Sequence, residues 1–257
     1  MATTFEEPAR VDSERRFFLI LSSIISLGIV AGFVIQLAAG RSTFNVPLPY
    51  HLHGVVFFAW VALFMAQNVL ITRGNVALHR TLGMISVFWV PLMVALGITI
   101  MVVVLRRTGG PFFFAQNIFL FSNIGGLTLF AILTFSALRV RRHTGWHRRL
   151  MLCGFALLSN PGFGRIMPMP LLIPYAWHLM MLVVLAFPVV GMIYDKRRRG
   201  HVHPAWFWGA GAIIVMQVIA DLVAVSPLGI SLTQQLIAGT PGAERPMEAF
   251  LPPGFTL

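Results

Sequence analysis

Long runs of apolar residues, separated by short polar and basic segments, dominate the sequence. A helix that crosses a membrane needs about 20 mostly apolar residues, because no backbone polar group can stay unpaired in hydrocarbon. Seven stretches meet or approach this length. They are residues 17–39, 52–71, 82–105, 112–138, 147–165, 175–194 and 205–225. The pattern predicts an all-α fold, a polytopic membrane bundle of about seven transmembrane helices.

The fifth stretch is the shortest, since its uninterrupted apolar run covers only residues 150–158 before the polar and Pro-containing segment 159–162. Lys and Arg are enriched in the inner loops of membrane proteins, so their distribution tests each topology. With seven spans and the N-terminus inside, fourteen of the nineteen Lys and Arg residues lie inside, against twelve if the fifth stretch does not cross. The fourteen are Arg10, Arg15, Arg16, Arg73, Arg80, Arg139, Arg141, Arg142, Arg148, Arg149, Lys196, Arg197, Arg198 and Arg199. We therefore expect seven spans, with the N-terminus inside and the C-terminus outside.

The segments outside the spans are short and carry no long apolar run. We expect residues 1–16 to be a mobile cytoplasmic N-terminus, residues 17–225 the transmembrane domain, and residues 226–257 an external tail with one short amphipathic helix near 228–238. The first apolar run follows Arg15 and Arg16, as in a signal peptide, but it is too long for a signal sequence. It is therefore expected to be a retained helix.

Composition supports the membrane assignment and excludes several soluble functions. The chain is 57% hydrophobic and 11% charged, which rules out a soluble monomer. The net charge of +11 lies in short basic runs between apolar segments, so it indicates membrane topology and no nucleic-acid partner. The single cysteine, Cys153, excludes an internal disulfide, and no CxxC, HExxH, GxSxG or phosphate-binding loop motif is present.

Three predicted inner loops share a plan in which basic residues are followed by a helix that opens with a histidine. They contain RGNVALHRTLG at 73–83, RRHTGWHRRLM at 141–151 and KRRRGHVHPAW at 196–206. His79, His147 and His203 therefore occupy equivalent positions in a weak internal repeat. These residues are either interfacial anchors beside Trp146 and Trp206, or ligands and proton carriers at the inner face.

The combination of HLHG opening the second span, HRTLG opening the third, HRRLM opening the fifth and YD followed by HPA leading into the seventh resembles a family of uncharacterised bacterial multi-pass membrane proteins. The resemblance covers about residues 45–225. It implies a seven-helix or similar protein of the bacterial inner (cytoplasmic) membrane. It implies no settled activity, cofactor or catalytic residue.

Polar residues at membrane depth gather near the predicted outer end. His53, His178 and Asp221 all lie about one turn from the outer ends of their helices, at a depth similar to that of Asn160 and Arg165. A carboxylate in hydrocarbon is costly, by at least about 2.5 kcal/mol at the centre of a bilayer, so Asp221 should have a partner. The group is either a cluster of structural hydrogen bonds between helices or a functional site.

The second span carries a further polar stripe. His53, Trp60 and Gln67 are spaced i, i+7 and i+14, so they share one face of a helix.

One functional hypothesis is a haem b carrier in transmembrane electron transfer. Two histidines from different helices at one depth can ligate a haem iron, and His53 with His178 at the outer end and His79 with His147 at the inner end offer such pairs. Arg80 and Arg148 are candidate partners of haem propionates. The arrangement is similar to that of bis-histidine membrane cytochromes in architecture only.

The alternative is an intramembrane enzyme whose site lies at the outer end. His51, His53, His178 and Asp221 are candidate ligands for zinc or iron. Without a metal, Asp221, His53 and His178 are candidate catalytic groups for acid–base chemistry on a lipophilic substrate such as a quinone. A third possibility is an accessory subunit of a membrane complex that binds no cofactor. In every case membrane lipid is an expected partner.

Overall fold

The structure is a computed structural model that describes residues 6–255, with side chains from residue 12 onward. These residues form helices and connecting loops, with no strand among them. The helices are α1 (Glu6–Ala38), α2 (Leu48–Thr72), α3 (Val76–Gly83), α4 (Ser86–Thr108), α5 (Gln116–Arg139), α6 (Thr144–Leu157), α7 (Asn160–Ile166), α8 (Ala176–Arg199), α9 (Pro204–Val225) and α10 (Pro227–Ile237), with short 3-10 helices η1 (Met169–Leu172) and η2 (Pro241–Glu244).

Six of these helices are long and apolar enough to cross a membrane. They are α1 over Asp12–Ala38, α2, α4, α5, α8 and α9, and each supplies 22 to 27 residues. Their mean hydropathy and length fit a multi-pass membrane protein. The all-helical architecture and the membrane-spanning length of these six helices therefore agree with the sequence prediction.

The remaining predicted span, residues 147–165, is not one long helix. It consists of α6 and α7, which are separated at Leu158 and Ser159, and Pro161 lies in the first turn of α7. Proline cannot donate a backbone hydrogen bond inside a helix, so a new helix begins at this point. Ser159 Oγ donates to the carbonyl of Ala156 at 2.6 Å and satisfies one of the carbonyls at the break.

The broken segment nevertheless connects the two ends of the bundle. At its start, Arg149 of α6 bonds Asp195 near the end of α8. At its end, η1 packs against α8, which begins at Ala176. Because α8 is one helix of 24 residues, the chain between Thr144 and Ala176 must travel the length of that helix.

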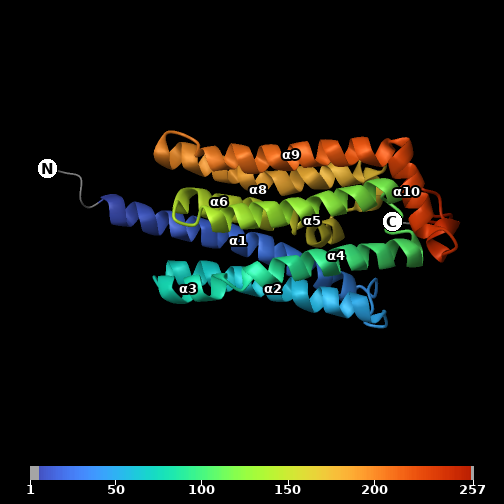
Figure 1. The fold of residues 1–257 in the computed structure, drawn as a ribbon, viewed down its shortest axis with the longest axis horizontal. Helices are drawn as coiled ribbons and strands as arrows, with labels where there is room; N and C mark the ends of the chain where they lie inside the picture. The colour runs from blue at the N-terminus through green and yellow to red at the C-terminus, as the bar shows by residue number, and fades with distance from the viewer. Residues whose placement is uncertain (1–5, 256–257) are drawn as a thin grey trace.

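The helices form an elongated bundle in which α5 and α6 lie between two outer groups (Figure 1). One group contains α2, α3 and α4, and the other contains α8 and α9, while α1 packs against α2, α6 and α7. We call one end of the bundle the α3 end, where α3, the end of α8 and the starts of α6 and α9 lie. We call the opposite end, which α10 covers, the α10 end.

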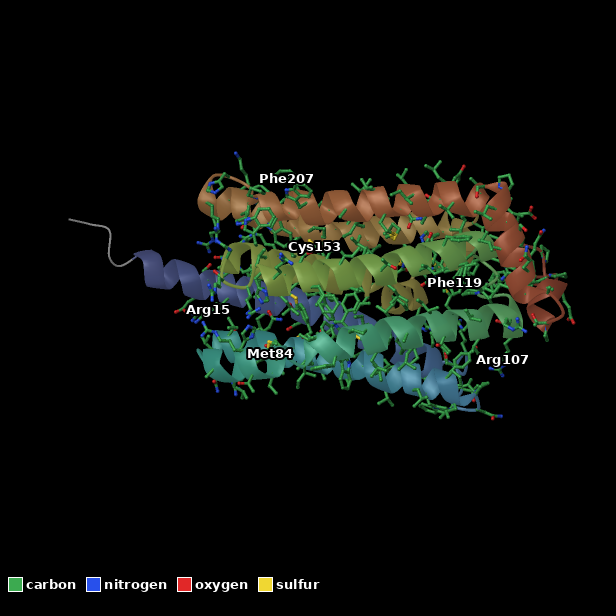
Figure 2. All side chains as sticks on the ribbon, in the orientation of Figure 1. Arg15, Met84, Arg107, Phe119, Cys153 and Phe207 are labelled. Carbon is green, nitrogen blue, oxygen red and sulfur yellow. The ribbon has the colours of Figure 1, made fainter. Side chains whose placement is uncertain are left out.

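The interior is closely packed, and the outer faces are apolar. A Cβ placed on Gly32 of α1 would lie 2.0 Å from the carbonyl oxygen of Gly162 in α7, so these two helices approach closely through glycine. Large apolar side chains project outward, as Phe207 does, whereas Cys153 lies inside (Figure 2). Phe88 is 81% exposed, which suits a surface that faces lipid.

The terminal segments extend the bundle. Helix α1 begins at Glu6, so residues 6–16 are helical, and Glu14 is buried. The mobility expected for residues 1–16 stays a prediction. Helix α10 nearly covers the expected short helix at 228–238, and the Arg245 guanidinium donates to the carbonyls of Gly110 and Phe114, which holds the tail against the bundle.

Candidate functional site

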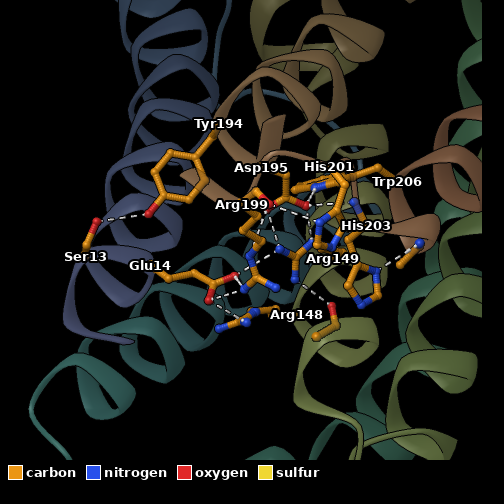
Figure 3. Close-up of polar contacts among 12 residues, drawn as sticks. Ser13, Glu14, Arg148, Arg149, Tyr194, Asp195, Arg199, His201, His203 and Trp206 are labelled. Atoms are coloured by element: carbon orange, nitrogen blue, oxygen red, sulfur yellow. Dashed lines mark hydrogen bonds and ion pairs between the residues drawn. The ribbon is translucent and has the colours of Figure 1, made fainter. Parts of the chain in front are cut away.

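A cluster of buried charges lies at the α3 end (Figure 3). Its acids are Glu14 and Asp195, and its bases are Arg148, Arg149 and Arg199. Arg149 is fully buried, and it donates from Nε to Asp195 Oδ2 at 2.9 Å and from a terminal nitrogen to Glu14 Oε1 at 2.9 Å. Arg148 lies 2.7 Å from the second oxygen of Glu14. This Arg149 cluster ties α1, α6 and α8 together.

Asp195 is the most heavily bonded group of the cluster. Besides Arg149, its Oδ2 accepts from Trp206 Nε1 at 2.9 Å and from the backbone nitrogen of His203 at 3.2 Å. A buried carboxylate is tolerated when it is paired and hydrogen-bonded, so these donors keep Asp195 ionised in the interior. The Arg149 cluster is therefore a network of ion pairs that links helices inside the bundle, and both of its acids are paired.

The sequence prediction missed Glu14 and Asp195. Glu14 lies in the predicted N-terminal segment, and the predicted sixth span ends at residue 194, directly before Asp195. The available signal was the spacing of Asp195 and Arg199, which is i, i+4 on one helix face.

His203 helps to begin α9. Its Nδ1 accepts from the backbone nitrogen of Ala205 at 3.1 Å, and its ring lies edge-on to Trp146. Burial and the positive charge of Arg149 lower the pKa of His203, which favours the neutral form that this cap requires. Of the three equivalent histidines, His203 is thus used as a cap.

The other two histidines of the repeat face each other. The ring centres of His79 on α3 and His147 on α6 are 6.2 Å apart, with an angle of 83° between the ring planes. His147 Nδ1 lies 2.9 Å from the carbonyl of Ala137. When Nδ1 donates to that carbonyl, Nε2 carries the lone pair, which is the tautomer that a metal-ligating histidine commonly has.

Several polar atoms near this pair have no protein partner. His79 Nδ1 and both amide atoms of Gln67 are buried without a hydrogen bond among the described residues. Gly83 lies one turn after His79 on α3, and a Cβ placed there would be in ordinary van der Waals contact with Gln67 Oε1, at 3.8 Å. Buried amides without partners are costly, so this place between α2, α3 and α6 has the properties of a ligand site. We call His79, His147, Gln67 and Gly83 the His79 site.

The electrostatic surroundings of the His79 site favour the neutral form of the His79 imidazole. Burial, and then the neighbouring His147, lower the pKa of His79, so its imidazole is neutral and able to bind a metal near neutral pH. Arg80 follows His79 in the chain and is exposed. Arg148 follows His147, but it is already paired with Glu14, and its buried Nε has no partner in the described chain.

At the α10 end, His178 and Asp221 form a direct contact. His178 Nε2 lies 3.1 Å from Asp221 Oδ2, and Gln217 Nε2 donates to Asp221 Oδ1 at 2.8 Å. Gln217 also donates to Ser122 Oγ at 2.9 Å and accepts from Trp177 Nε1 at 3.0 Å. The structure thus brings together His178 and Asp221, two members of the group predicted from the sequence.

The remaining predicted residues of the outer group form no hydrogen bond with this pair in the described chain, although His53 and Arg165 lie close enough for their charges to interact. The His53 ring packs at a tilt of 31° against Phe57 with ring centres 4.0 Å apart, and its buried Nδ1 has no partner in the described chain. Its helix, α2, packs mainly against α1, α3 and α4, whereas the α8 of His178 packs mainly against α6, α7 and α9. His51 is exposed on the first turn of α2. Ligation of one haem by His53 and His178 therefore stays a prediction without a contact to support it.

Asn160 and Arg165 hold the broken segment in place. The Asn160 amide lies 4.0 Å from the sulfur of Met181, and the Arg165 guanidinium donates to the carbonyl of Pro161 at 2.7 Å while lying over the Phe33 ring. Over the described part of the chain, no three His, Cys, Asp or Glu residues come together as a metal-binding group. A zinc or iron site formed by His51, His53, His178 and Asp221 stays a prediction.

The polar stripe predicted on the second span lies on α2. His53, Trp60 and Gln67 each carry a buried polar atom that lacks a partner among the described residues.

Comparison with known proteins identifies no relative: no family model, no curated protein and no solved structure matches the chain. The class that the fold defines is a multi-pass, all-helical membrane protein, and the His79 site is its most specific chemical feature.

Proposed function

We propose that this chain is a membrane-embedded haem b protein that carries electrons, with His79 and His147 as the axial ligands. The observation that carries the proposal is the separation of the two rings. A metal-bound imidazole nitrogen lies about 2 Å from the metal and its ring centre about 3 Å, so two histidines on opposite sides of one iron have ring centres about 6 Å apart. The separation of 6.2 Å between His79 and His147 agrees with this value.

The surroundings of the pair support a large, partly polar ligand. Gly83, on the face of α3 that carries His79, has no side chain to obstruct a ligand, and the unpartnered amide of Gln67 can hydrogen-bond a propionate. Arg80 is exposed beside the site and supplies a positive charge for a second propionate. Haem bound in this way would supply reversible one-electron chemistry, and a lipophilic quinone or another membrane subunit is the expected electron partner.

We further propose seven membrane crossings, with the α3 end inside and the α10 end outside a bacterial inner membrane. The path of residues 144–176 along the bundle supports a crossing by the broken segment. The positions of the basic residues support the orientation, since Arg148, Arg149 and the run 196–199 all lie at the α3 end.

The haem proposal is tested by expressing the protein with ample haem precursor and recording absorption spectra of the purified samples. His79→Ala and His147→Ala are each expected to lose the haem, and added imidazole should partly restore it to His79→Gly. His143→Ala and His201→Ala are matched controls, because both residues are exposed histidines at the same end. Full haem content in both ligand variants would overturn the assignment.

A further inference from the structure

The His178 and Asp221 pair is partly exposed on the bundle. The side chain of His178 is 47% exposed and that of Asp221 is 29% exposed. Both lie about one turn from the ends of their helices, since α8 begins at Ala176 and α9 ends at Val225. The pair therefore lies on the lateral surface of the bundle, close to the α10 end.

Apolar side chains surround the pair on the same helix faces. Leu182 follows His178 by one turn and is 60% exposed, and Val218 and Val225 lie one turn before and after Asp221 and are also exposed. Leu222, beside Asp221, is 65% exposed. With the membrane placement proposed above, on which this argument rests, these side chains face lipid, so the polar pair opens toward the hydrocarbon just below the headgroups.

The hydrogen bonds behind the pair orient the Asp221 carboxyl group. Asp221 Oδ1 accepts from Gln217, whose other contacts, with Ser122 and Trp177, hold its amide in one orientation. When Asp221 is ionised, both of its oxygens are acceptors, so His178 Nε2 donates to Asp221 Oδ2. In that tautomer, His178 Nδ1 carries a free lone pair.

We propose that His178 and Asp221 form a lipid-accessible binding site for a lipophilic phenol or hydroquinone, whose hydroxyl group donates a hydrogen bond to His178 Nδ1. A phenol meets both requirements of the site: its hydroxyl is a good donor, and its ring and alkyl chain are compatible with Leu182 and Leu222. A hydroxyl donor suits this site better than a cation, because the Asp221 charge is already shared between His178 and Gln217. The site is separate from the His79 site, which lies at the opposite end of the bundle.

The test is solid-state NMR of the whole protein, labelled with ¹⁵N-histidine and reconstituted in phospholipid bilayers. The resonances of His178 are assigned by their loss in His178→Gln. Added para-octylphenol is expected to shift the unprotonated His178 nitrogen, whereas para-octylanisole, which has the same shape but no hydroxyl donor, should leave it unchanged. Asp221→Asn should weaken the response to the phenol about tenfold, because it disturbs the tautomer that presents Nδ1.

Three results would overturn the proposal. The first is no shift with the phenol, and the second is an equal shift with the anisole, which would indicate a general change in the lipid. The third is efficient disulfide formation between copies of the Cys153→Ala, Leu222→Cys variant in native membranes, which would show that a second copy covers this face. Because the haem spectrum does not depend on His178, failure here is distinguishable from failure of the haem proposal.

Discussion

His79 and His147 come from different helices of the bundle, yet their rings face each other at 6.2 Å and almost at right angles. His147 is oriented by the carbonyl of Ala137, and His79 has a buried nitrogen without a partner in the described chain. An interfacial anchor would direct its polar atoms toward water or headgroups. Two rings that lie edge-on to each other between α3 and α6, with centres 6.2 Å apart, agree with the shared ligand proposed above.

Replacement of the Gln67 amide should affect stability and haem binding in opposite directions. Gln67→Leu removes two buried polar atoms that have no protein partner, so the haem-free protein should be at least as stable as the parent in a thermal unfolding assay. The same change should weaken haem binding by roughly 1 kcal/mol, or about fivefold, through the loss of one hydrogen bond.

Asn68→Leu is the matched control for Gln67→Leu. Asn68 is the next residue on α2, but its amide already donates to the carbonyl of Phe64 at 2.9 Å. Its replacement should leave haem affinity unchanged. Equal loss of haem in both variants would show that Gln67 acts only through the stability of α2.

Replacement of Arg149 should have a large effect on stability, although no catalytic or binding role is proposed for the Arg149 cluster. Arg149→Met removes the fully buried guanidinium that bonds both Asp195 and Glu14 and leaves them the partly exposed Arg199 and Arg148, so we expect a loss of roughly 3 kcal/mol in the free energy of unfolding. The double variant Arg149→Met, Asp195→Asn should recover part of this loss. Arg198→Met, at an exposed position of the same end, should change stability very little.

The pH dependence of the haem-free protein follows from His79. Burial and His147 lower the pKa of His79 from its ordinary value of 6.5, so the unfolded chain binds a proton at this residue before the folded chain does. Stability from His79 is therefore complete above about pH 6.5 and falls as the pH decreases below it. Thermal unfolding between pH 7.5 and pH 5 should show this loss, and it should be smaller in His79→Gln. An unchanged pH profile in that variant would contradict the burial of a neutral His79.

The sequence predicted the long helices well because each depends on a local property. Twenty or more apolar residues without a break specify α2, α5, α8 and α9 to within a few residues. The break at 159–162 was visible because Pro161 cannot continue a helix. The third span differs, since a turn at Met84 and Ile85 separates α3 from α4 and leaves His79 on a short helix of its own.

The sites were predicted less completely because they depend on rotation and pairing of distant helices. The contact of His178 with Asp221 could be expected from depth alone, and His79 and His147 could be assigned to one end by their repeat. That the second pair faces each other depends on how α3 and α6 are rotated, which no local pattern specifies. The Arg149 cluster escaped prediction because Arg149 lies 135 residues from Glu14 and 46 from Asp195 along the chain.

The topology predicts which positions react with a membrane-impermeant thiol reagent. In a Cys153→Ala background, Arg41→Cys should be labelled from outside intact spheroplasts, whereas Arg73→Cys and Arg198→Cys should be labelled only after the membrane is opened. Arg198 is the decisive position, because it lies after the broken segment. Labelling of Arg198→Cys from outside would show that residues 144–176 do not cross the membrane.

The most direct test of the central claim is a reduced-minus-oxidised absorption spectrum of the purified protein, together with haem quantification. The account predicts one haem b per chain, with a Soret band that shifts on reduction and sharp α and β bands from an iron with two histidine ligands. Protein that is made with ample haem, is folded and still shows no visible absorption would contradict it.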